Sequence, residues 1–246
     1  WRGVFNGLAV ITVFASIYLW VFLPENKRTD ENLPSLQLQL NQMGEVFRSR
    51  IFWDIAPLAA ISQGANMAIN GLWMKPWLRD VAGLNSDNAA QLLFVMTLAF
   101  IGGFLTLGII AERLSQLFDI RPISISVFGM TLFLFIQGTM IFGGFGSPLI
   151  LVLLLGFFGT ASVLVYAGYA QIFPKYLSGR VSTILNLLVF ICAFILQWGV
   201  GVIIEMWPAT ETGYDPKSYQ AAIGVLFLLQ ATGLIWYFLS IKLSRK

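Results

Sequence analysis

The chain alternates between long apolar stretches and short polar connections. Five of the stretches have the roughly 20 residues that one helix needs to cross ~30 Å of hydrocarbon. A longer one has room for two such helices, with a Gly-Gly-Phe-Gly-Ser-Pro turn at 143–148 between them. The stretches that carry no Lys, Arg, Asp or Glu are residues 3–24, 55–74, 88–111, 122–174, 181–204 and 218–241. The pattern predicts an all-α membrane protein with seven transmembrane helices.

The basic residues predict an orientation for these spans. The predicted spans are residues 4–23, 51–78, 90–112, 123–142, 148–173, 181–206 and 220–241. Their connections fall on alternate sides, and one side collects 11 of the 15 Lys and Arg residues. The positive-inside rule places that side in the cytoplasm. We therefore expect Trp1 outside and Lys246 in the cytoplasm.

The composition agrees with a lipid-facing surface. The chain is 57% hydrophobic and 11% charged, whereas globular domains are about 25% charged. Its 21 Phe, eight Trp and seven Tyr residues fit aromatic belts at the membrane edges. The formal net charge of +3 comes from basic residues scattered over short loops, so we expect no nucleic-acid partner.

The chemistry-bearing residue types are few. Histidine is absent, which excludes His metal ligands, His general bases and His proton relays from this chain. The single cysteine, Cys192, lies in an apolar span and has no internal disulfide partner. No carboxylate pair gathers near one membrane face. We expect no cofactor and no metal, and a polytopic membrane enzyme is disfavoured.

The longest polar connection, residues 24–50, is the expected domain boundary. Within it Leu36, Leu40, Met43 and Phe47 recur at helical spacing. Two interpretations stay open: an amphipathic helix on the cytoplasmic membrane face, or a partly ordered linker. The expected division is therefore 1–23, 24–50 and 51–246. Because the chain starts at Trp1 without an initiator Met, we expect it to be a piece of a longer polypeptide.

Polar side chains inside the spans are the candidate binding residues. Gln63, Asn66 and Asn70 recur at i, i+3 and i+7 and share one helix face. Polar groups at mid-depth face another helix or a water-filled cavity, and three on one face exceed what packing needs. We expect this face to line a cavity. The further expected lining residues are Asn186 and Gln197 of the sixth span and Tyr166 and Tyr169 of the fifth.

The alternative for such residues is that they join helices. Interhelical hydrogen bonds contribute on the order of 0.6 kcal/mol each. For the isolated Gln137 and Gln230, in the otherwise apolar fourth and seventh spans, we favour this structural role.

Three motifs resemble those of the major facilitator superfamily. Gly108-Ile-Ile-Ala-Glu112-Arg113 is similar to the G-x-x-x-[D/E]-R loop between that family's eighth and ninth helices. Residues 1–25, from Trp-Arg-x-x-Phe to Leu-Pro-Glu, resemble its sixth helix. Residues 173–180, Phe-Pro-Lys-Tyr-Leu-Ser-Gly-Arg, resemble its loop between helices ten and eleven. The resemblance covers the whole chain.

The resemblance implies a fold and a function. Residues 1–23 would be the last helix of the N-terminal half, and 51–246 the C-terminal six-helix bundle. That bundle would hold two inverted three-helix repeats about an axis near the membrane plane. The implied function is secondary active transport of a small solute by alternating access, with a coupling proton as a candidate. The implied partners are the substrate, the lipid bilayer and the missing N-terminal half, and the implied location is the cell membrane, in bacteria the inner membrane. A non-transporting receptor or scaffold on the same fold stays open.

The resemblance also implies a cytoplasmic gate at Gly108, Glu112, Arg113, Gly179 and Arg180. Gly108 would let neighbouring helices approach closely. Glu112 would accept hydrogen bonds from the N–H groups at the N-terminus of a facing helix. The two arginines would pair with carboxylates or with helix C-termini. The alternative is a polar collar that only ends the spans.

Overall fold

The computed structural model describes residues 2–23, 35–143, 146–208 and 213–244. The chain divides into two compact units, Trp1–Gln39 and Leu40–Lys246. The division falls inside the predicted linker, of which residues 24–34 lie outside the described part. The described residues form helices and no strand. The all-α prediction is therefore confirmed.

The first unit contains α1 (Arg2–Phe22). Its sequence is apolar all round, and none of its residues is buried. The hydroxyls of Thr12 and Ser16 donate to the carbonyls of Leu8 and Thr12, each at 2.8 Å. Because these polar groups are satisfied within the helix, α1 presents a surface suited to lipid on every side.

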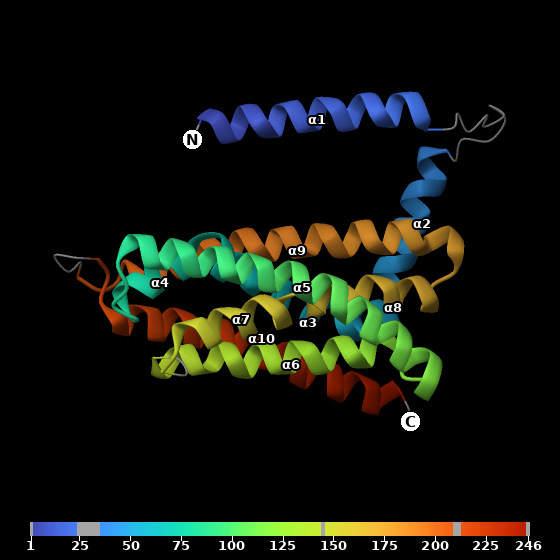
Figure 1. Cartoon of the computed structure of the whole chain (residues 1–246). Helices are drawn as coiled ribbons and strands as arrows, with labels where there is room; N and C mark the ends of the chain where they lie inside the picture. Colours follow the sequence, from blue (N-terminus) through green and yellow to red (C-terminus); the bar gives the residue numbers. More distant parts are fainter. Residues whose placement is uncertain (1, 24–34, 144–145, 209–212, 245–246) are drawn as a thin grey trace. The chain divides into compact units, whose positions relative to one another are not determined.

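The second unit is a bundle of long helical rods (Figure 1). It begins within α2 (Leu36–Arg48). This helix covers the linker residues whose apolar side chains recur at helical spacing. The elements that follow are α3 (Arg50–Ala68), η2 (Ile69–Trp73), α4 (Met74–Asp80), α5 (Ser86–Phe118), α6 (Pro122–Thr139), η3 (Met140–Phe142), α7 (Pro148–Gly159), η4 (Ala161–Val163), α8 (Leu164–Ile172), α9 (Lys175–Ile204) and α10 (Pro216–Ser244). Every predicted span is helical.

Within the described residues, six helices are long and apolar enough to cross a membrane. They are Arg2–Phe22, Ser86–Phe118, Pro122–Phe142, Pro148–Ile172, Lys175–Ile204 and Pro216–Leu243. The second predicted span is not among them, although it is helical from Arg50 to Asp80. This span carries the three carboxamides, and its α-helix is interrupted by η2. The carboxamides separate it from the more apolar rods, whereas an interruption does not, because η3 and η4 also interrupt two of the six.

Local sequence signals set the helix ends. Pro122 and Pro148 occupy the first turns of α6 and α7, where a missing N–H costs no helical hydrogen bond. Asn85 caps α5, because its side chain accepts from the Asn88 N–H at 2.8 Å. At the other end of α5, Asp119 takes a left-handed conformation with φ 54°, which turns the chain sharply into α6.

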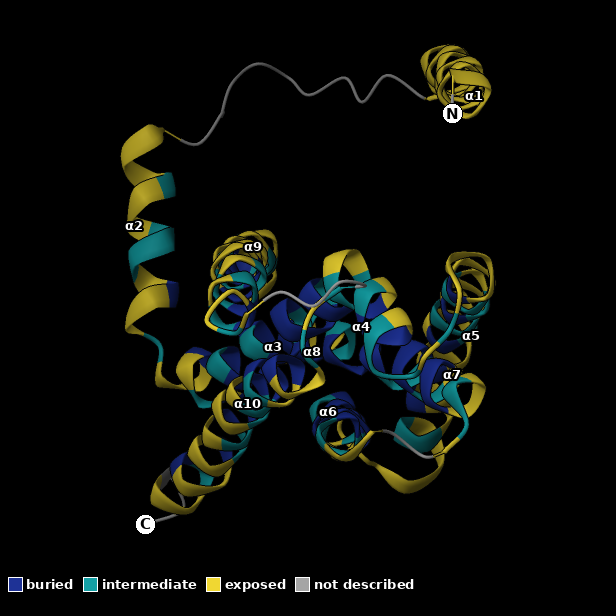
Figure 2. Cartoon of the chain, turned by 90° about the vertical axis from the view of Figure 1, so that its left-hand side faces the viewer, coloured by how far each residue is buried: buried dark blue, intermediate teal, exposed yellow. Residues whose placement is uncertain are grey.

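The rods pack in a repeated pattern. α3 contacts α9 and α10, α5 contacts α7, and α6 contacts α7, α8 and α10. These pairings map onto one another when α3 is exchanged with α7–α8, α5 with α9, and α6 with α10. Seen end-on, α3 is largely buried, whereas α5, α9 and α10 carry exposed outer faces (Figure 2).

Glycines provide the closest helix contacts. A Cβ at Gly103 of α5 would lie 2.5 Å from the Phe157 carbonyl of α7, and one at Gly156 of α7 would lie 2.5 Å from the Met96 carbonyl of α5. Gly64 of α3 lies close to α9, because an added Cβ there would be 3.0 Å from the Cys192 Cβ and from the Ala193 backbone N. Backbone atoms cannot retreat as a flexible side chain can. The α5–α7 and α3–α9 contacts therefore depend on the absence of side chains at these positions.

We predict that Gly103→Ala destabilises the bundle by about 1–3 kcal/mol, the usual cost of overpacking. The matched control is Gly199→Ala in α9, where an added methyl meets no heavy atom within 4 Å. It should leave stability unchanged or slightly raised, because Ala favours helix. The measurement is reversible unfolding in detergent micelles. Equal effects of both changes would contradict the close α5–α7 contact.

Gln137 of α6 and Gln230 of α10 form a buried pair. Gln230 Nε2 donates to Gln137 Oε1 at 2.5 Å, and both side chains are at most 1% exposed. Gln137 Nε2 and Gln230 Oε1 have no partner among the described residues. One bond therefore joins two otherwise apolar rods, which confirms the expected helix-joining role.

A double-mutant cycle of Gln137→Leu and Gln230→Leu should give a coupling free energy of about 0.6–1.7 kcal/mol, the range for such bonds in membranes. The control cycle combines Gln137→Leu with Gln91→Leu, an exposed position on α5. Distant sites add to within about 0.5 kcal/mol. A coupling no larger than in the control would contradict a stabilising pair.

Candidate functional site

The carboxamides of α3 are held by a tight contact with α7. Asn70 Nδ2 donates to Asn66 Oδ1 at 2.6 Å. Asn66 is 3% exposed, and Gly159 of α7 lies so close that a Cβ there would collide with the Asn66 carboxamide. Asn66 is thus fixed between two helices, and its oxygen in turn orients Asn70. Of the three predicted residues, Asn66 contacts the neighbouring helix, and Asn70 is half-buried.

Gln63 lies one turn before Asn66 on α3 and is half-buried. Its Oε1 is buried, and no described donor reaches it. A buried acceptor without a donor costs free energy. In this respect it resembles Gln137 Nε2 and Gln230 Oε1, which are also buried without a partner among the described residues.

Asn70 sits in the π-helical segment η2, a feature that sequence periodicity missed. The Met74 N–H bonds the Ile69 carbonyl, five residues back, so the helix is widened by one residue at this point. Such π turns occur frequently at functional sites. Gly71 offers a weak signal in the sequence, but the i, i+3, i+7 spacing assumes a regular helix and cannot reveal the extra residue.

Gln197 of α9 ties this segment to the neighbouring helix. Its side-chain Nε2 donates to the Met67 carbonyl at 3.2 Å. Its backbone carbonyl accepts a hydrogen bond from Trp73 Nε1 at 3.1 Å. Gly201 makes room for the Trp73 ring, which an added Cβ would meet at 3.2 Å. Gln197 therefore lies next to the α3 polar face. Its side-chain N–H and its backbone carbonyl form hydrogen bonds that join α9 to α3 and η2. Trp73 is a member of the site that sequence reasoning missed.

The two predicted tyrosines have different environments. Tyr166 is half-buried, and its hydroxyl donates to Asn186 Oδ1 of α9 at 3.4 Å. Tyr169 is 1% exposed, donates to the Phe52 carbonyl at 2.6 Å and stacks on the Phe52 ring at 5.5 Å. The structure places Tyr169 inside the core of the unit, because the Phe52 carbonyl satisfies its hydroxyl there. The Tyr166–Asn186 pair lies nearer the surface, with Asn186 exposed.

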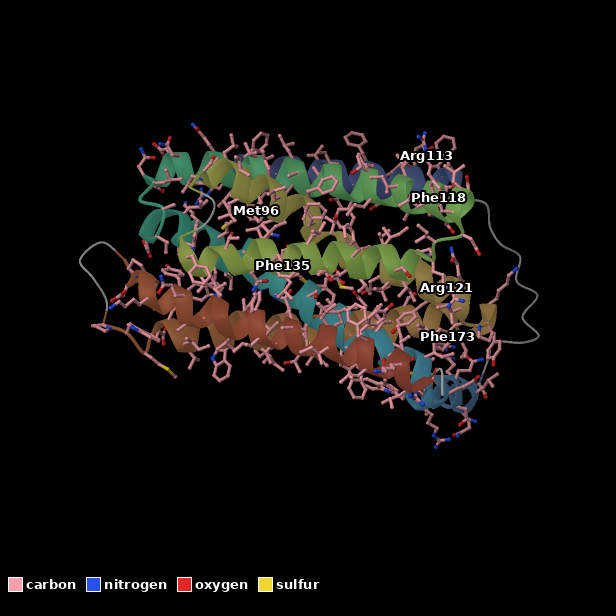
Figure 3. The ribbon with its side chains drawn as sticks, turned by 90° about the horizontal axis from the view of Figure 1, so that it is seen from below. Met96, Arg113, Phe118, Arg121, Phe135 and Phe173 are labelled. Atoms are coloured by element: carbon pink, nitrogen blue, oxygen red, sulfur yellow. The ribbon has the colours of Figure 1, made fainter. Side chains whose placement is uncertain are left out.

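The predicted gate residues of α5 make few contacts in this unit. An added Cβ at Gly108 would meet no heavy atom within 4 Å, so the close helix approach expected there occurs at Gly103 instead. Glu112 accepts from Gln116 Nε2 of its own helix at 3.2 Å rather than from a facing helix N-terminus. Arg113 is exposed at the same end of the bundle as Arg121 and Phe173 (Figure 3).

The gate residues of α9 lie beside α2. Arg180 Nε donates to Gln42 Oε1 at 3.1 Å, and the neighbouring Tyr176 hydroxyl donates to Glu45 Oε1 at 2.9 Å. Gly179 is open, with no atom near an added Cβ. Within the described residues no hydrogen bond or ion pair joins Arg180 to the α5 group. Arg180 thus bonds a carboxamide of the linker helix, where a carboxylate was expected.

The chemistry of the α3 face is limited to hydrogen bonding. Carboxamides and phenols both donate and accept, but none is an acid or base near neutral pH. Among the described residues no group of three or more His, Cys, Asp or Glu comes together that could hold a metal ion. The arrangement suits the reversible binding of a polar solute group.

A family model described as Major Facilitator Superfamily matches residues 1–196, about four fifths of the chain. A comparison with curated proteins found no match.

Proposed function

The chain belongs to the major facilitator superfamily, a family of multi-pass membrane transporters, and we propose that it serves secondary active transport of a small solute by alternating access. The observation that carries the proposal is the family match over residues 1–196. The membrane-length apolar helices agree with it. Substrate contacts are assigned to the half-buried part of the α3 polar face.

Gln63 and Asn70 are the proposed contact residues. The Gln63 Oε1 atom lacks a donor among the described residues, and Asn70 keeps its carbonyl oxygen and one N–H beyond its bond to Asn66. Asn66 acts as a positioning residue, because it orients Asn70 and is itself enclosed by Gly159. Asn186, Tyr166 and Gln197 would extend the polar surface along α8 and α9.

Thiol accessibility tests this assignment without knowledge of the substrate. With Cys192→Ala as background, Asn70→Cys and Gln63→Cys should react with a small charged methanethiosulfonate reagent in membrane vesicles. The matched control is Gln137→Cys, which replaces a carboxamide buried between α6 and α10 and should stay unreactive. Alternating access predicts that the reagent reaches position 70 from either side of the membrane. If Asn70→Cys is as protected as the control and only lowers thermal stability, the polar face joins helices and binds no solute.

We further propose seven membrane crossings, with the α2 end of the bundle in the cytoplasm. Helical continuity from Arg50 to Asp80 supports a crossing there despite its polar residues. The symmetric packing of α3, α5 and α6 with α7–α8, α9 and α10 supports two inverted three-helix repeats.

Single cysteines at the two ends of α5 test the orientation. We predict that Ser86→Cys is labelled by an impermeant maleimide added outside cells, and that Ser115→Cys is labelled only after permeabilisation. The expectation follows from the bias of basic residues toward the side that contains Arg113 and Arg121. The opposite labelling pattern would reverse the topology.

The cytoplasmic gate is proposed at the same end, from Gly108, Glu112 and Arg113 on α5 and Gly179 and Arg180 on α9. The open space beside both glycines supports it, because a second helix bundle can approach there. The Arg180–Gln42 bond supports a role for α2 in holding the start of α9 while the gate moves.

A further inference from the structure

The helix that carries the candidate site ends on a buried carboxylate. Asp80 is the last residue of α4, and its side chain is only 5% exposed. The helix dipole disfavours an acidic group at a helix C-terminus, and a buried charge is costly unless it is paired and hydrogen-bonded. The sequence thus places a locally unfavourable group at this position, and its partners must compensate for it.

Three groups compensate for the Asp80 carboxylate. The Tyr219 hydroxyl donates to Asp80 Oδ2 at 2.7 Å, and the Tyr214 N–H donates to the same oxygen at 3.1 Å. The Arg79 guanidinium lies 3.6 Å from Asp80 Oδ1. Gly213 packs against the carboxylate so closely that an added Cβ would collide with it. Asp80 therefore fastens the end of α4 to the start of α10 and to the turn before it.

The turn that Asp80 contacts is itself fixed to α10. The Lys217 N–H donates to Asp215 Oδ1 at 2.8 Å, and Ser218 Oγ donates to the Asp215 carbonyl at 2.6 Å. Ser218 is fully buried. In Figure 1, α4 lies at the end of the bundle where α10 begins. The Asp80 bonds thus join α4 to a part of the chain that is held in place by contacts of its own.

A second polar bond holds the start of α4. Trp73 is the last residue of the π turn and immediately precedes α4. Its Nε1 donates to the backbone carbonyl of Gln197 on α9 at 3.1 Å. Because Asp80 bonds α10 at the other end, α4 is bonded to a different neighbouring helix at each of its ends.

Packing alone leaves space beside this segment. Met74, Trp77 and Leu78 are buried, but a small cavity of about 10 Å³ remains where Ile69, Trp73 and Trp77 face side chains of α9 and α10. Trp77 Nε1 makes no hydrogen bond within the described residues. A void forfeits van der Waals contacts for the side chains that line it. The polar bonds at the two ends of α4 therefore matter for its position.

The π turn makes the position of α4 matter for the polar face. The turn holds one residue more than an α-helical turn, so it can return to a regular α-helix only if α4 moves against α3. The bonds at Trp73 and Asp80 oppose this movement. Asn70 lies inside the π turn, whereas Gln63 lies in the regular helix before it. Movement of α4 would therefore shift Asn70 and leave Gln63 in place.

We propose that Asp80 and Trp73 are positioning residues for the polar face, because they hold α4 and thereby the π turn that carries Asn70. The proposal rests on the proposed role of Asn70 as a solute contact. Neither positioning residue contacts the solute. The Asp80 anchor is the stronger of the two, because hydrogen bonds to a charged group stabilise more than bonds between neutral groups.

Thiol reactivity at two positions tests the proposal. In the Cys192→Ala background, Asn70→Cys and Gln63→Cys are each combined with Tyr219→Phe, Asp80→Asn or Trp73→Phe. Loss of a hydrogen bond to a charged group should raise the reaction rate at position 70 roughly tenfold, and loss of the neutral Trp73 bond should raise it roughly threefold. The rate at position 63 should change by less than about twofold, the scatter expected for an independent site. A general loss of stability would instead raise both rates alike.

The chain offers a matched control for each Asp80 variant. Tyr214→Phe removes a hydroxyl like Tyr219→Phe, but it keeps the backbone N–H that bonds Asp80. Asp87→Asn neutralises an exposed carboxylate in the first turn of α5. Both control changes should leave the reaction rates at positions 63 and 70 unaltered. Tyr219→Phe also keeps the buried ring, so it tests the anchor even where Asp80→Asn fails to fold.

Hydrogen exchange followed by mass spectrometry separates this proposal from the proposed function, because it requires no solute contact. Tyr219→Phe should accelerate exchange roughly tenfold in residues 69–80 and leave residues 55–66 unchanged. If exchange responds in this way while position 70 stays unreactive in every background, the anchoring of α4 stands and the role of Asn70 as a solute contact fails. Unchanged exchange in residues 69–80, or equal changes of reactivity at positions 63 and 70, would overturn the anchoring itself.

Discussion

Every feature of this protein depends on the lack of water in the hydrocarbon core of a membrane. Backbone N–H and C=O groups must there be satisfied within the chain, which leaves helices as the solution for these apolar segments. Isolated hydroxyls follow the same rule: Thr97 and Thr106 of α5 donate to carbonyls one turn back at 2.9 and 2.7 Å. The carboxamides of Gln137 and Gln230 satisfy it in part: one bond joins them between helices, and Gln137 Nε2 and Gln230 Oε1 have no partner among the described residues.

Because lipid is as apolar as the side chains, these helices associate through close packing rather than through burial from water. Gly103 and Gly156 bring α5 and α7 together, and Gly64 does the same for α3 and α9. The proposed repeat would exchange these two helix pairs. A unit held by close contacts of this kind is suited to move as a body, as the proposed alternating access would require.

Two polar regions of the second unit differ in chemistry: the carboxamide face of α3 and the cavity near Arg121. The α3 face offers neutral carboxamides beside a π turn, which suits weak and reversible hydrogen bonds to a solute. The cavity near Arg121 offers both signs of charge beside isoleucines.

The sequence by itself determined the helices, because charge-free stretches of membrane length have few other structures open to them, and its motifs indicated the family. It also predicted that Gln63, Asn66 and Asn70 share one helix face, and it indicated the helix-joining role of Gln137 and Gln230. Only the tertiary structure decided what lies against each face. Tyr169 bonds Phe52 inside the core, Asn66 is enclosed by Gly159, and Gly108 is open where Gly103 is not. Helical periodicity tells which residues share a face, but the partner of that face comes from helices distant in sequence. The π turn at 69–73 departs from the regular helical period that such patterns assume, and the cavity near Arg121 is lined by elements distant in sequence, so no local pattern could reveal either.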